Sequence, residues 1–219
     1  MSTPRLAADA AVLGGNIYVV GGCYGGYADG VQELSSVESF DPATGIWTAV
    51  APMNAPRSGH GVVSAQGKLF AAGGFTRDEQ GVHKTLSSVE CFDPSTGVWT
   101  TINPMNGARV WLGLAVLGDK LFVIGGMDMQ DGKGKLSSVE CLELSVPNGA
   151  WKPVAPMTMP RSQVGVAVMG GKIYAMGGPK DNARTSMECF DPNEEPPGRW
   201  TLVTDAHMEP SMGAKYSAL

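Results

Sequence analysis

The histidines are the first side chains to test for chemistry, because a metal centre or a general base commonly draws on them. The chain has three of them, His60, His83 and His207. They stand at unrelated places in the sequence pattern, and a functional metal ion needs several ligands gathered around it. Their spacing is therefore a weak signal for a metal site.

The stretch "FTRDEQGVHKT" (75–85) holds the densest group of candidate ligands. Asp78, Glu79 and His83 come together there, and Glu79 and His83 could ligate a cation. The same composition is typical of a solvated polar loop, which is the interpretation we adopt. The sequence contains neither a G-x-S-x-G nucleophile motif nor a phosphate-binding loop. We therefore expect no enzyme activity, no metal and no cofactor.

Two kinds of charged residue recur once in each copy of a repeating pattern. Arginine occurs at 5, 57, 109 and 161, always 52 residues apart, and glutamate occurs at 38, 90, 140 and 188. A ring of binding charges would explain this pattern, but a residue that every copy requires is better explained as part of a common framework. We interpret these residues as partly buried Arg–Glu pairs. On this hypothesis Arg109→Ala and Glu140→Ala each lower the melting temperature, with non-additive effects.

The elements that position these charges belong to an internal repeat. The stretch "LSSVESFDPATGIWT" (34–48) returns as "LSSVECFDPSTGVWT" (86–100), with twelve of fifteen positions identical. A Gly-Gly pair begins at 21, 73, 125 and 177, and tryptophan recurs at 47, 99, 151 and 200. Repeats of this length indicate a repeat protein. We divide the single region 1–219 into units 5–56, 57–108, 109–160 and 161–210, with a partial unit at 211–219.

Each unit is predicted to form four strands. The first strand is rich in small residues and ends at a two-residue turn, and the second strand ends in the Gly-Gly pair. The third strand is the "LSSVE" run, and a turn such as "DPATG" leads to the fourth, which carries the tryptophan. The predicted first strands are 6–13, 58–65, 110–117 and 162–169.

A single four-stranded sheet would leave both of its faces uncovered, and stacking copies radially covers them. Small residues in the first strand suit a crowded axis, and tryptophan in the fourth suits a wide rim. The expected fold is an all-β protein, a β-propeller with four four-stranded antiparallel blades plus the first strand of a fifth.

The residues "GG", "SVE.FDP..G.W" and "PM...R", in units of about 50 residues, resemble the Kelch repeat over positions 5–210. Units 3 and 4 depart from the pattern at "CLELSVPNG" (141–149) and "DPNEEPPGRW" (191–200). Kelch propellers usually have more blades than four, so we expect a part of a six-bladed ring. A truncated gene product and a closed four-bladed ring remain as alternatives.

Charge and cysteine usage limit the partners and the compartment. The net charge is −5, and Lys and Arg are scattered, whereas a nucleic-acid binder needs a basic face. We find no apolar run long enough to span a membrane and no secretory signal. Cys91, Cys141 and Cys189 occupy equivalent places in successive units, too far apart to pair, and Cys23 stands in a loop. We expect a cytoplasmic protein with reduced cysteines that binds neither nucleic acid nor membrane.

The segments between the second and third strands differ most between units, and such loops on a rigid scaffold commonly carry recognition. They are 23–33, 75–85, 127–135 and 179–184. In the Kelch adaptors that the chain resembles, partner peptides contact residues at or soon after the place that follows the Gly-Gly pair, and the residue that follows the repeated arginine. The resemblance therefore assigns partner binding to Tyr24, Phe75, Met127, Ser58 and Ser162, whereas Leu6, Val110 and Pro179 depart from the pattern.

Two further kinds of residue are candidates for partner binding. Trp111 stands where the other units have Ala7, Gly59 and Gln163, so the repeat does not need a large ring there. It could anchor a partner at the channel mouth, or it could plug an enlarged channel. Arg77 and Arg184 could pair with acidic groups of a partner, although exposed loop arginines are commonly just solvated.

These observations predict a non-catalytic protein–protein interaction module that binds a partner peptide or loop on the loop face. The resemblance implies a role as the substrate-recognition part of a ubiquitin-ligase adaptor. The alternatives are a Kelch-like enzyme or carbohydrate binder that uses the axial pocket, and a nonfunctional truncation product. An open ring would expose blade faces and permit self-association through them.

Overall fold

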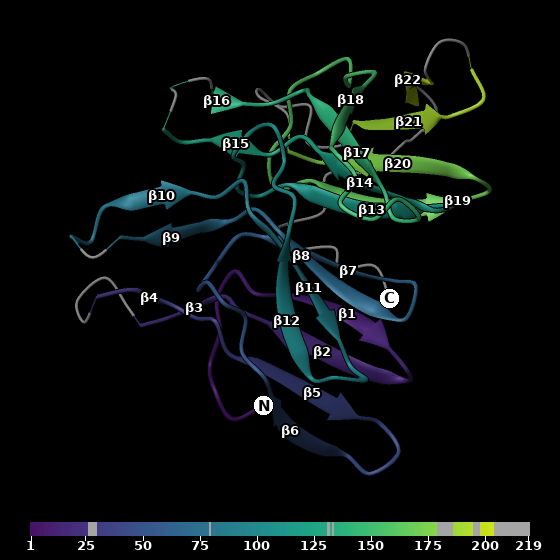
Figure 1. Ribbon diagram of the computed structural model, residues 1–219. Helices are drawn as coiled ribbons and strands as arrows, with labels where there is room; N and C mark the ends of the chain where they lie inside the picture. The colour runs from purple at the N-terminus through teal and green to yellow at the C-terminus, as the bar shows by residue number, and fades with distance from the viewer. Residues whose placement is uncertain are drawn as a thin grey trace. The chain divides into compact units, whose positions relative to one another are not determined.

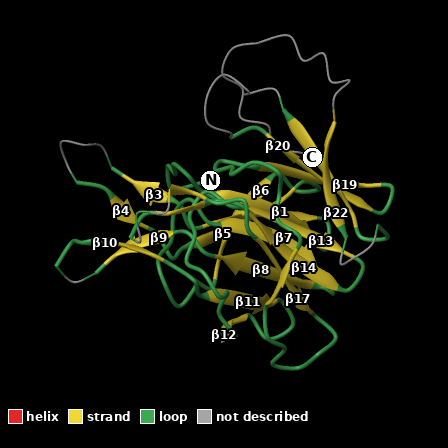
Figure 2. Ribbon diagram, turned by 90° about the horizontal axis from the view of Figure 1, so that it is seen from above, coloured by secondary structure: helices red, strands yellow, loops and turns green. Residues whose placement is uncertain are grey.

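The computed structural model describes residues 1–25, 30–78, 80–130, 132, 134–178, 186–194 and 198–203. Across these ranges all of the regular elements are β-strands and none is a helix (Figures 1 and 2). The chain forms two compact units, Met1–Val110 and Trp111–Leu219. Each unit contains two four-stranded antiparallel sheets, which we call blades.

Unit 1 holds blades 1 and 2, in which the strands follow one another across the sheet in chain order. Blade 1 consists of β1 (Asp9–Leu13), β2 (Asn16–Val20), β5 (Val37–Asp41) and β6 (Ile46–Val50). Blade 2 consists of β7 (Gly61–Ala65), β8 (Lys68–Ala72), β11 (Val89–Asp93) and β12 (Val98–Ile102).

Unit 2 holds blades 3 and 4 with the same strand order. Blade 3 consists of β13 (Gly113–Leu117), β14 (Lys120–Ile124), β17 (Val139–Glu143) and β18 (Lys152–Val154). Blade 4 consists of β19 (Gly165–Met169), β20 (Lys172–Met176), β21 (Met187–Asp191) and β22 (Arg199–Val203). The four predicted antiparallel blades are confirmed. The partial unit 211–219 lies outside the described residues, and the six-bladed ring stays a prediction.

The predicted first strands begin three residues too early. β1 starts at Asp9 rather than at residue 6, and the other three blades show the same offset. The reason is a left-handed backbone at the second residue after each repeated arginine, which a strand cannot accommodate. The φ values are +50° at Ala7, +62° at Gly59, +54° at Trp111 and +54° at Gln163.

The predicted third strands are also too long. The "LSS" part of each "LSSVE" run lies outside the strand, which starts at Val37 in blade 1 and at Val89 in blade 2. The backbone there has other partners, because the carbonyl oxygen of Ser36 accepts hydrogen bonds from the amide of Gly21 and from the Arg5 side chain.

The segments after the Gly-Gly pairs are more ordered than the loops that the sequence predicts. Three of them form short antiparallel hairpins. They are β3–β4 (Cys23–Tyr24 and Gln32–Glu33), β9–β10 (Phe75–Arg77 and His83–Thr85) and β15–β16 (Met127–Asp128 and Gly134–Lys135). Cys23 therefore lies in a strand rather than in a loop. All four cysteines are buried free thiols.

In unit 1 the two blades pack face to face. The trailing face of blade 1 presents Ala11, Leu13, Tyr18, Val20 and Val37, and the leading face of blade 2 presents Val62, Leu69, Ala71, Phe92 and Trp99. The rings of Tyr18 and Phe92 meet across this interface with centroids 6.2 Å apart. Burying a Phe or Leu side chain here stabilises the unit by roughly 2 kcal/mol.

Unit 2 repeats this packing at equivalent positions. The trailing face of blade 3 presents Ala115, Leu117, Phe122, Ile124 and Val139, and the leading face of blade 4 presents Val166, Ile173, Ala175, Phe190 and Trp200. The rings of Phe122 and Phe190 meet with centroids 5.8 Å apart. A Cβ placed on Gly113 would collide with Cγ2 of Val166, so the two first strands approach too closely at this position for any side chain larger than that of glycine.

Candidate partner-binding face

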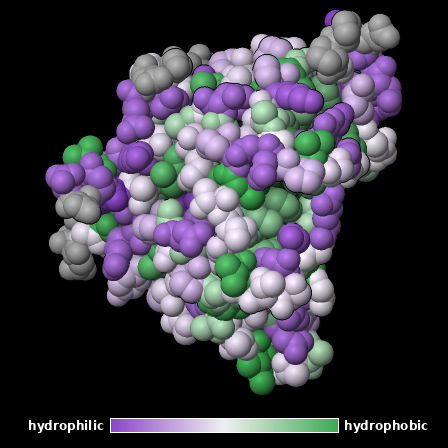
Figure 3. All heavy atoms as spheres, viewed as in Figure 1, coloured by the Kyte–Doolittle hydropathy of each residue, from purple (hydrophilic) through white to green (hydrophobic). Residues whose placement is uncertain are grey.

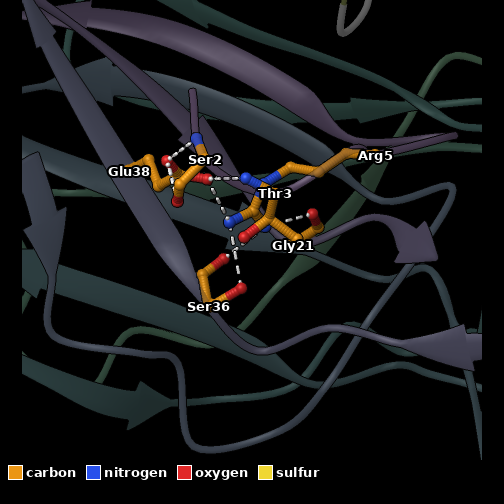
Figure 4. Close-up of polar contacts among 6 residues, drawn as sticks. All are labelled: Ser2, Thr3, Arg5, Gly21, Ser36 and Glu38. Atoms are coloured by element: carbon orange, nitrogen blue, oxygen red, sulfur yellow. Dashed lines mark hydrogen bonds and ion pairs between the residues drawn. The ribbon is translucent and has the colours of Figure 1, made fainter. Parts of the chain in front are cut away.

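The repeated arginine acts as a clamp at the base of the variable segments of blades 1, 2 and 4. In blade 1 the Arg5 guanidinium donates hydrogen bonds to the carbonyl oxygens of Gly21 and Ser36, each 2.8 Å away, and to the carboxylate of Glu38 at 3.0 Å (Figure 4). Gly21 and Ser36 stand at the two ends of the segment that carries β3–β4. The arginine therefore joins those two ends and pairs with the charged glutamate at the same time.

The same clamp occurs in both units. Arg57 donates to the carbonyl oxygens of Gly73 and Ser88 and lies 2.7 Å from the carboxylate of Glu90. In blade 4, Arg161 donates to the carbonyl oxygens of Gly177 and Ser186 and to the carboxylate of Glu188. The expected Arg–Glu pairing is confirmed for Arg5–Glu38, Arg57–Glu90 and Arg161–Glu188.

The clamp glutamate is held as a carboxylate. Burial alone would raise the pKa of Glu38, but hydrogen bonds from the amide and hydroxyl of Ser2, from Arg5 and from the amide of Thr3 outweigh burial and lower that pKa to about 2. In blade 2, burial lowers the pKa of Arg57, and the charge of Glu90 opposes this shift. Arg5 therefore helps to keep Glu38 ionised, and Glu90 favours the ionised form of Arg57.

The two hairpins of unit 1 project side by side beyond these clamps (Figures 1 and 2). An ion pair links them, with Nε of Arg77 on β9 3.5 Å from Oε1 of Glu33 on β4. The Glu33 side chain is 5% exposed, whereas the Arg77 side chain is 32% exposed and stays within reach of solvent. The structure therefore gives Arg77 an acidic partner within its own unit.

Ser58 and Phe75, both assigned to partner binding, lie next to each other at the root of β9. Their backbones exchange two hydrogen bonds, from the Ser58 amide to the Phe75 carbonyl oxygen at 3.0 Å and from the Phe75 amide to the Ser58 carbonyl oxygen at 2.9 Å. Ser58 is fully buried, and the half-buried Phe75 ring lies 5.3 Å from the ring of His83 on β10. A partner could therefore touch Phe75 but not the Ser58 side chain.

The Cys23 thiol lies next to the Arg77–Glu33 ion pair. Cys23 is opposite Glu33 in the β3–β4 register. Burial raises the pKa of the Cys23 thiol, and the charge of Glu33 raises it further, while the Ser58 hydroxyl and the Arg77 guanidinium oppose the shift. The thiol therefore stays protonated at neutral pH and is a poor nucleophile.

The outer part of these hairpins is apolar as well as charged. Tyr24 on β3 is 53% exposed, and Val82 between β9 and β10 is 60% exposed. We call Tyr24, Phe75, Arg77, Val82 and His83 the hairpin face. It includes three of the residues that the resemblance or the loop charges indicated, Tyr24, Phe75 and Arg77, and all of them belong to unit 1. Phe75 and Arg77 share one side of β9, whereas Tyr24 lies on the side of β3–β4 opposite to Glu33, the partner of Arg77.

Unit 2 holds the other three assigned residues. Met127 on β15 is half-buried and opposite Lys135, and Ser162 is buried with its amide donating to the carbonyl oxygen of Gly178 at 3.3 Å. Trp111 is half-buried, and its carbonyl oxygen accepts a hydrogen bond from the Gln163 amide at 2.7 Å. Arg184 and Pro179 lie outside the described residues.

The backbone at Trp111 is unfavourable for a bulky residue. A left-handed conformation costs a non-glycine residue roughly 1–2 kcal/mol, and Gly59 is the residue best suited to this place. The backbone conformation at this position therefore does not favour a tryptophan. The reason for a tryptophan here must lie in what its side chain contacts.

The candidate metal ligands do not converge where the structure describes them. Asp78 accepts hydrogen bonds from the amides of Gln80 and Val82 in its own turn, and Glu79 and His207 fall outside the described residues. Burial lowers the pKa of His60 to about 3, with a further contribution from Arg57, so this imidazole is neutral. Among the described residues no group of three or more His, Cys, Asp or Glu side chains could hold a metal ion.

Sequence reasoning missed Glu33. Its segment and that of blade 2 have equal lengths, which places Glu33 where blade 2 has the buried Thr85. A glutamate at only one of two equivalent positions was a signal that a cation lies near this residue.

In the part of the chain that the structure describes, we also find no helix that is long and apolar enough to cross a membrane.

Known proteins share both the repeat and the fold. The chain matches the family model of the Kelch motif at residues 4–54, 56–106, 112–158 and 160–195. It is 29% identical to Kelch-like protein 25 of Xenopus tropicalis over 210 residues, which cover 93% of this chain and 33% of that protein. It is 31% identical to Kelch-like protein 36 of Rattus norvegicus over 173 residues, covering 78% of this chain and 28% of that protein. The chain spans about a third or less of the length of these curated relatives.

The solved structure of YjhT matches with a TM-score of 0.68 and 20% identity, covering 80% of this chain and 59% of that chain. At this identity the match supports the fold alone. Four-stranded blades that pack face to face within each unit, with an arginine clamp on the variable segments of blades 1, 2 and 4, define a β-propeller protein. The chain belongs to the Kelch-repeat family, because the Kelch motif covers most of its length.

Proposed function

We propose that the chain is a non-catalytic protein-interaction module that binds a partner peptide or loop on the hairpin face of unit 1. The observation that carries this proposal is a contrast within the unit. Arg5 and Arg57 form the same clamp with the same partners, whereas the hairpins above them differ in sequence and expose different side chains. Variable residues on a constant and rigid base are a common arrangement for recognition.

The chemistry of the hairpin face favours a partner that carries both an apolar and an acidic group. Tyr24 and Val82 offer exposed apolar surface, and tyrosine and arginine are enriched at binding hot spots. Arg77 keeps part of its guanidinium exposed beside Glu33. A peptide with an apolar side chain next to an acidic group would fit this face, since the acidic group could share Arg77.

In unit 2, Met127 and Trp111 remain part of the proposed binding residues, whereas Ser162 is buried like Ser58 and its side chain would not be reached by a partner. The left-handed backbone at Trp111 supports this role, because the residue is retained against a conformational cost. The similarity to Kelch-like proteins extends the proposal to a ubiquitin-ligase adaptor, in which the module would recognise the substrate.

A displayed library of random linear peptides tests the hairpin face directly. The purified chain selects peptides, and their affinities are then measured for the original chain and for Tyr24→Ala and Arg77→Ala. We expect each substitution to weaken binding by about tenfold or more, which corresponds to roughly 1.4 kcal/mol.

Val146→Ala is the matched control, because Val146 is similarly exposed but lies in a turn of unit 2. It should leave peptide affinity unchanged. Selection of no peptide, or equal binding by all variants, would contradict the proposal. A glycan array and a metal analysis of the same preparation report on the alternative, a carbohydrate binder or metal-dependent enzyme.

A further inference from the structure

One histidine stands in a place that is apolar in the other three blades. The equivalents of His60 are Ala8, Leu112 and Val164. On the surface, polar and apolar side chains are mixed (Figure 3), and a single polar residue there carries little information. His60 is only 5% exposed, so it is a buried polar residue that the repeat does not require.

The imidazole of His60 makes no hydrogen bond to the described part of the chain. Both ring nitrogens are buried, and neither has a partner at acceptable geometry. Most buried side-chain polar atoms in folded proteins do have one, because a group that leaves water without a new hydrogen bond destabilises the fold. An ionised imidazole without a partner would be far less favourable still. The site therefore accepts the neutral ring and disfavours the protonated one.

His60 lies against the roots of both hairpins of unit 1. A Cβ placed on Gly21, at the start of the segment that carries β3–β4, would lie 2.8 Å from Cε1 of His60. A Cβ placed on Gly74, just before β9, would lie 2.9 Å from Cβ of His60. Both distances are shorter than side chains allow, so the backbone of each root packs directly on the histidine. We call the contact of His60 with Gly21 and Gly74 the blade joint of unit 1.

Unit 2 has an equivalent joint without a histidine. A Cβ on Gly21 would meet the Arg57 carbonyl oxygen at 2.6 Å, and a Cβ on its equivalent Gly125 would meet the Arg161 carbonyl oxygen at 2.7 Å. The surroundings of the two glycines therefore match. Val164 takes the place of the histidine and packs against the apolar core of unit 2. Unit 2 is thus an internal comparison for the effect of the imidazole.

Charge and burial act on His60 in the same direction. Burial lowers its pKa and the positive charge of Arg57 lowers it further, whereas the Val20 backbone raises it, and the pKa falls from 6.5 to about 3. The ring therefore stays neutral in the folded chain in mild acid. In the unfolded chain it takes up a proton below about pH 6.5.

The carboxylates at the hairpin end of blades 1 and 2 already have partners. These are Glu38 with Arg5, Glu90 with Arg57, Glu33 with Arg77, and Asp9 with the amides of Ala10 and Val62. Asp9 acts in the opposite sense to His60. Burial raises the pKa of Asp9, so its contribution to stability improves as pH falls. A loss of stability in mild acid would therefore come from the histidine.

We propose that His60 makes the blade joint of unit 1 sensitive to mild acid, and that unit 2 lacks this sensitivity at the equivalent place. A proton on the imidazole would put a second positive charge beside Arg57 in a buried place without a free carboxylate. Opening of the joint exposes the ring and lets it take the proton, so acid favours the open form. Both hairpins of unit 1 would lose their support in that form. This sensitivity belongs to the fold and does not depend on the partner binding proposed above.

Denaturant unfolding at pH 7 and pH 5 tests the proposal. His60→Leu carries the residue of blade 3, and His60→Val carries that of blade 4. Between these pH values the unfolding equilibrium constant of the original chain should rise about 20-fold more than that of either variant. Hydrogen exchange, corrected for its intrinsic dependence on pH, should show the added opening in residues 58–77 and not in residues 162–178.

Val164→His is the matched reverse substitution. It places a histidine in the joint of unit 2 and should make residues 162–178 open more readily at pH 5 than at pH 7, although by less than in unit 1, because Val164 is half-buried. The same pH dependence in the original chain and both His60 variants would overturn the proposal. So would an original chain that gains stability in acid relative to those variants, or a Val164→His chain without added opening.

Discussion

Arg57 and Arg77 both pair with a glutamate in unit 1, yet the two pairs differ in every physical respect. Arg57 is fully buried, lies 2.7 Å from Glu90 and also binds two backbone carbonyl oxygens. Arg77 is one-third exposed and lies 3.5 Å from Glu33. Blades 1 and 4 contain the same pair as Arg57–Glu90, whereas Arg77–Glu33 joins two hairpins of unlike sequence.

The comparison separates two uses of the same ion pair. A pair that is buried and bonded to backbone at both ends of a segment fixes that segment in place. When the arginine of a pair is partly exposed and makes few other contacts, it can pair with a different acidic group. The exchange requires little further desolvation of its guanidinium. The first use explains why the arginine recurs in every repeat, and the second leaves Arg77 available for recognition.

Arg57→Ala should have the largest effect. It removes one partner of a buried pair and leaves the Glu90 carboxylate uncompensated, which costs about 3–5 kcal/mol. Denaturant unfolding measures this loss. Glu90→Ala should cost a similar amount, and the double variant far less than the sum. Additive losses would mean that the two side chains do not act as one clamp.

Glu38 tests the clamp of blade 1 through pH. Its pKa is lowered from 4.5 to about 2, so its stabilising effect is present above the unfolded-state pKa and is lost as pH falls through the folded-state value. The total is roughly 3 kcal/mol. Glu38→Gln should be less stable at neutral pH and should lose less stability between pH 5 and pH 2 than the original chain. Parallel pH profiles of unfolding free energy would contradict this assignment.

The clamps were predictable from sequence and the hairpin face only partly. Arg57 and Glu90 have counterparts in every unit, and a position that recurs in every unit reports on the common framework. Glu33 and Arg77 have no counterparts of the same residue type in the other units. Their pairing depends on how two hairpins fold and lie side by side. Spacing along one chain carries no information about that arrangement.

The strand ends show a second limit of the sequence. The apolar pattern of residues 6–13 reads as one strand, but the left-handed residue Ala7 interrupts it. Three of the four equivalent residues are not glycine, so the usual sequence signal for this conformation is present only at Gly59. At Ala7 a tertiary contact supports the left-handed conformation, because the Ala7 carbonyl oxygen accepts a hydrogen bond from the Gly59 amide.

Gln163 tests that backbone position with a smaller effect. It is exposed and has a φ of +54°, so its side chain contributes little to packing. Gln163→Val should lower the unfolding free energy by about 1 kcal/mol or more, because a β-branched residue is strained in the left-handed region. Gln163→Gly should cause no comparable loss. Equal stability of the two variants, measured by thermal unfolding, would show that the left-handed backbone at residue 163 does not strain a β-branched side chain.

Glu33→Gln should have the smallest effect and completes the comparison with the clamp. Its Arg77 partner can turn to solvent, so losing the pair should cost less than about 1 kcal/mol in unfolding free energy. Binding should respond in the opposite sense, because Arg77 no longer has a competing carboxylate within the unit. Peptides with an acidic group should then bind more tightly. A loss of stability as large as that of Arg57→Ala would instead make Glu33–Arg77 a structural pair, and the hairpin face would lose its exchangeable charge.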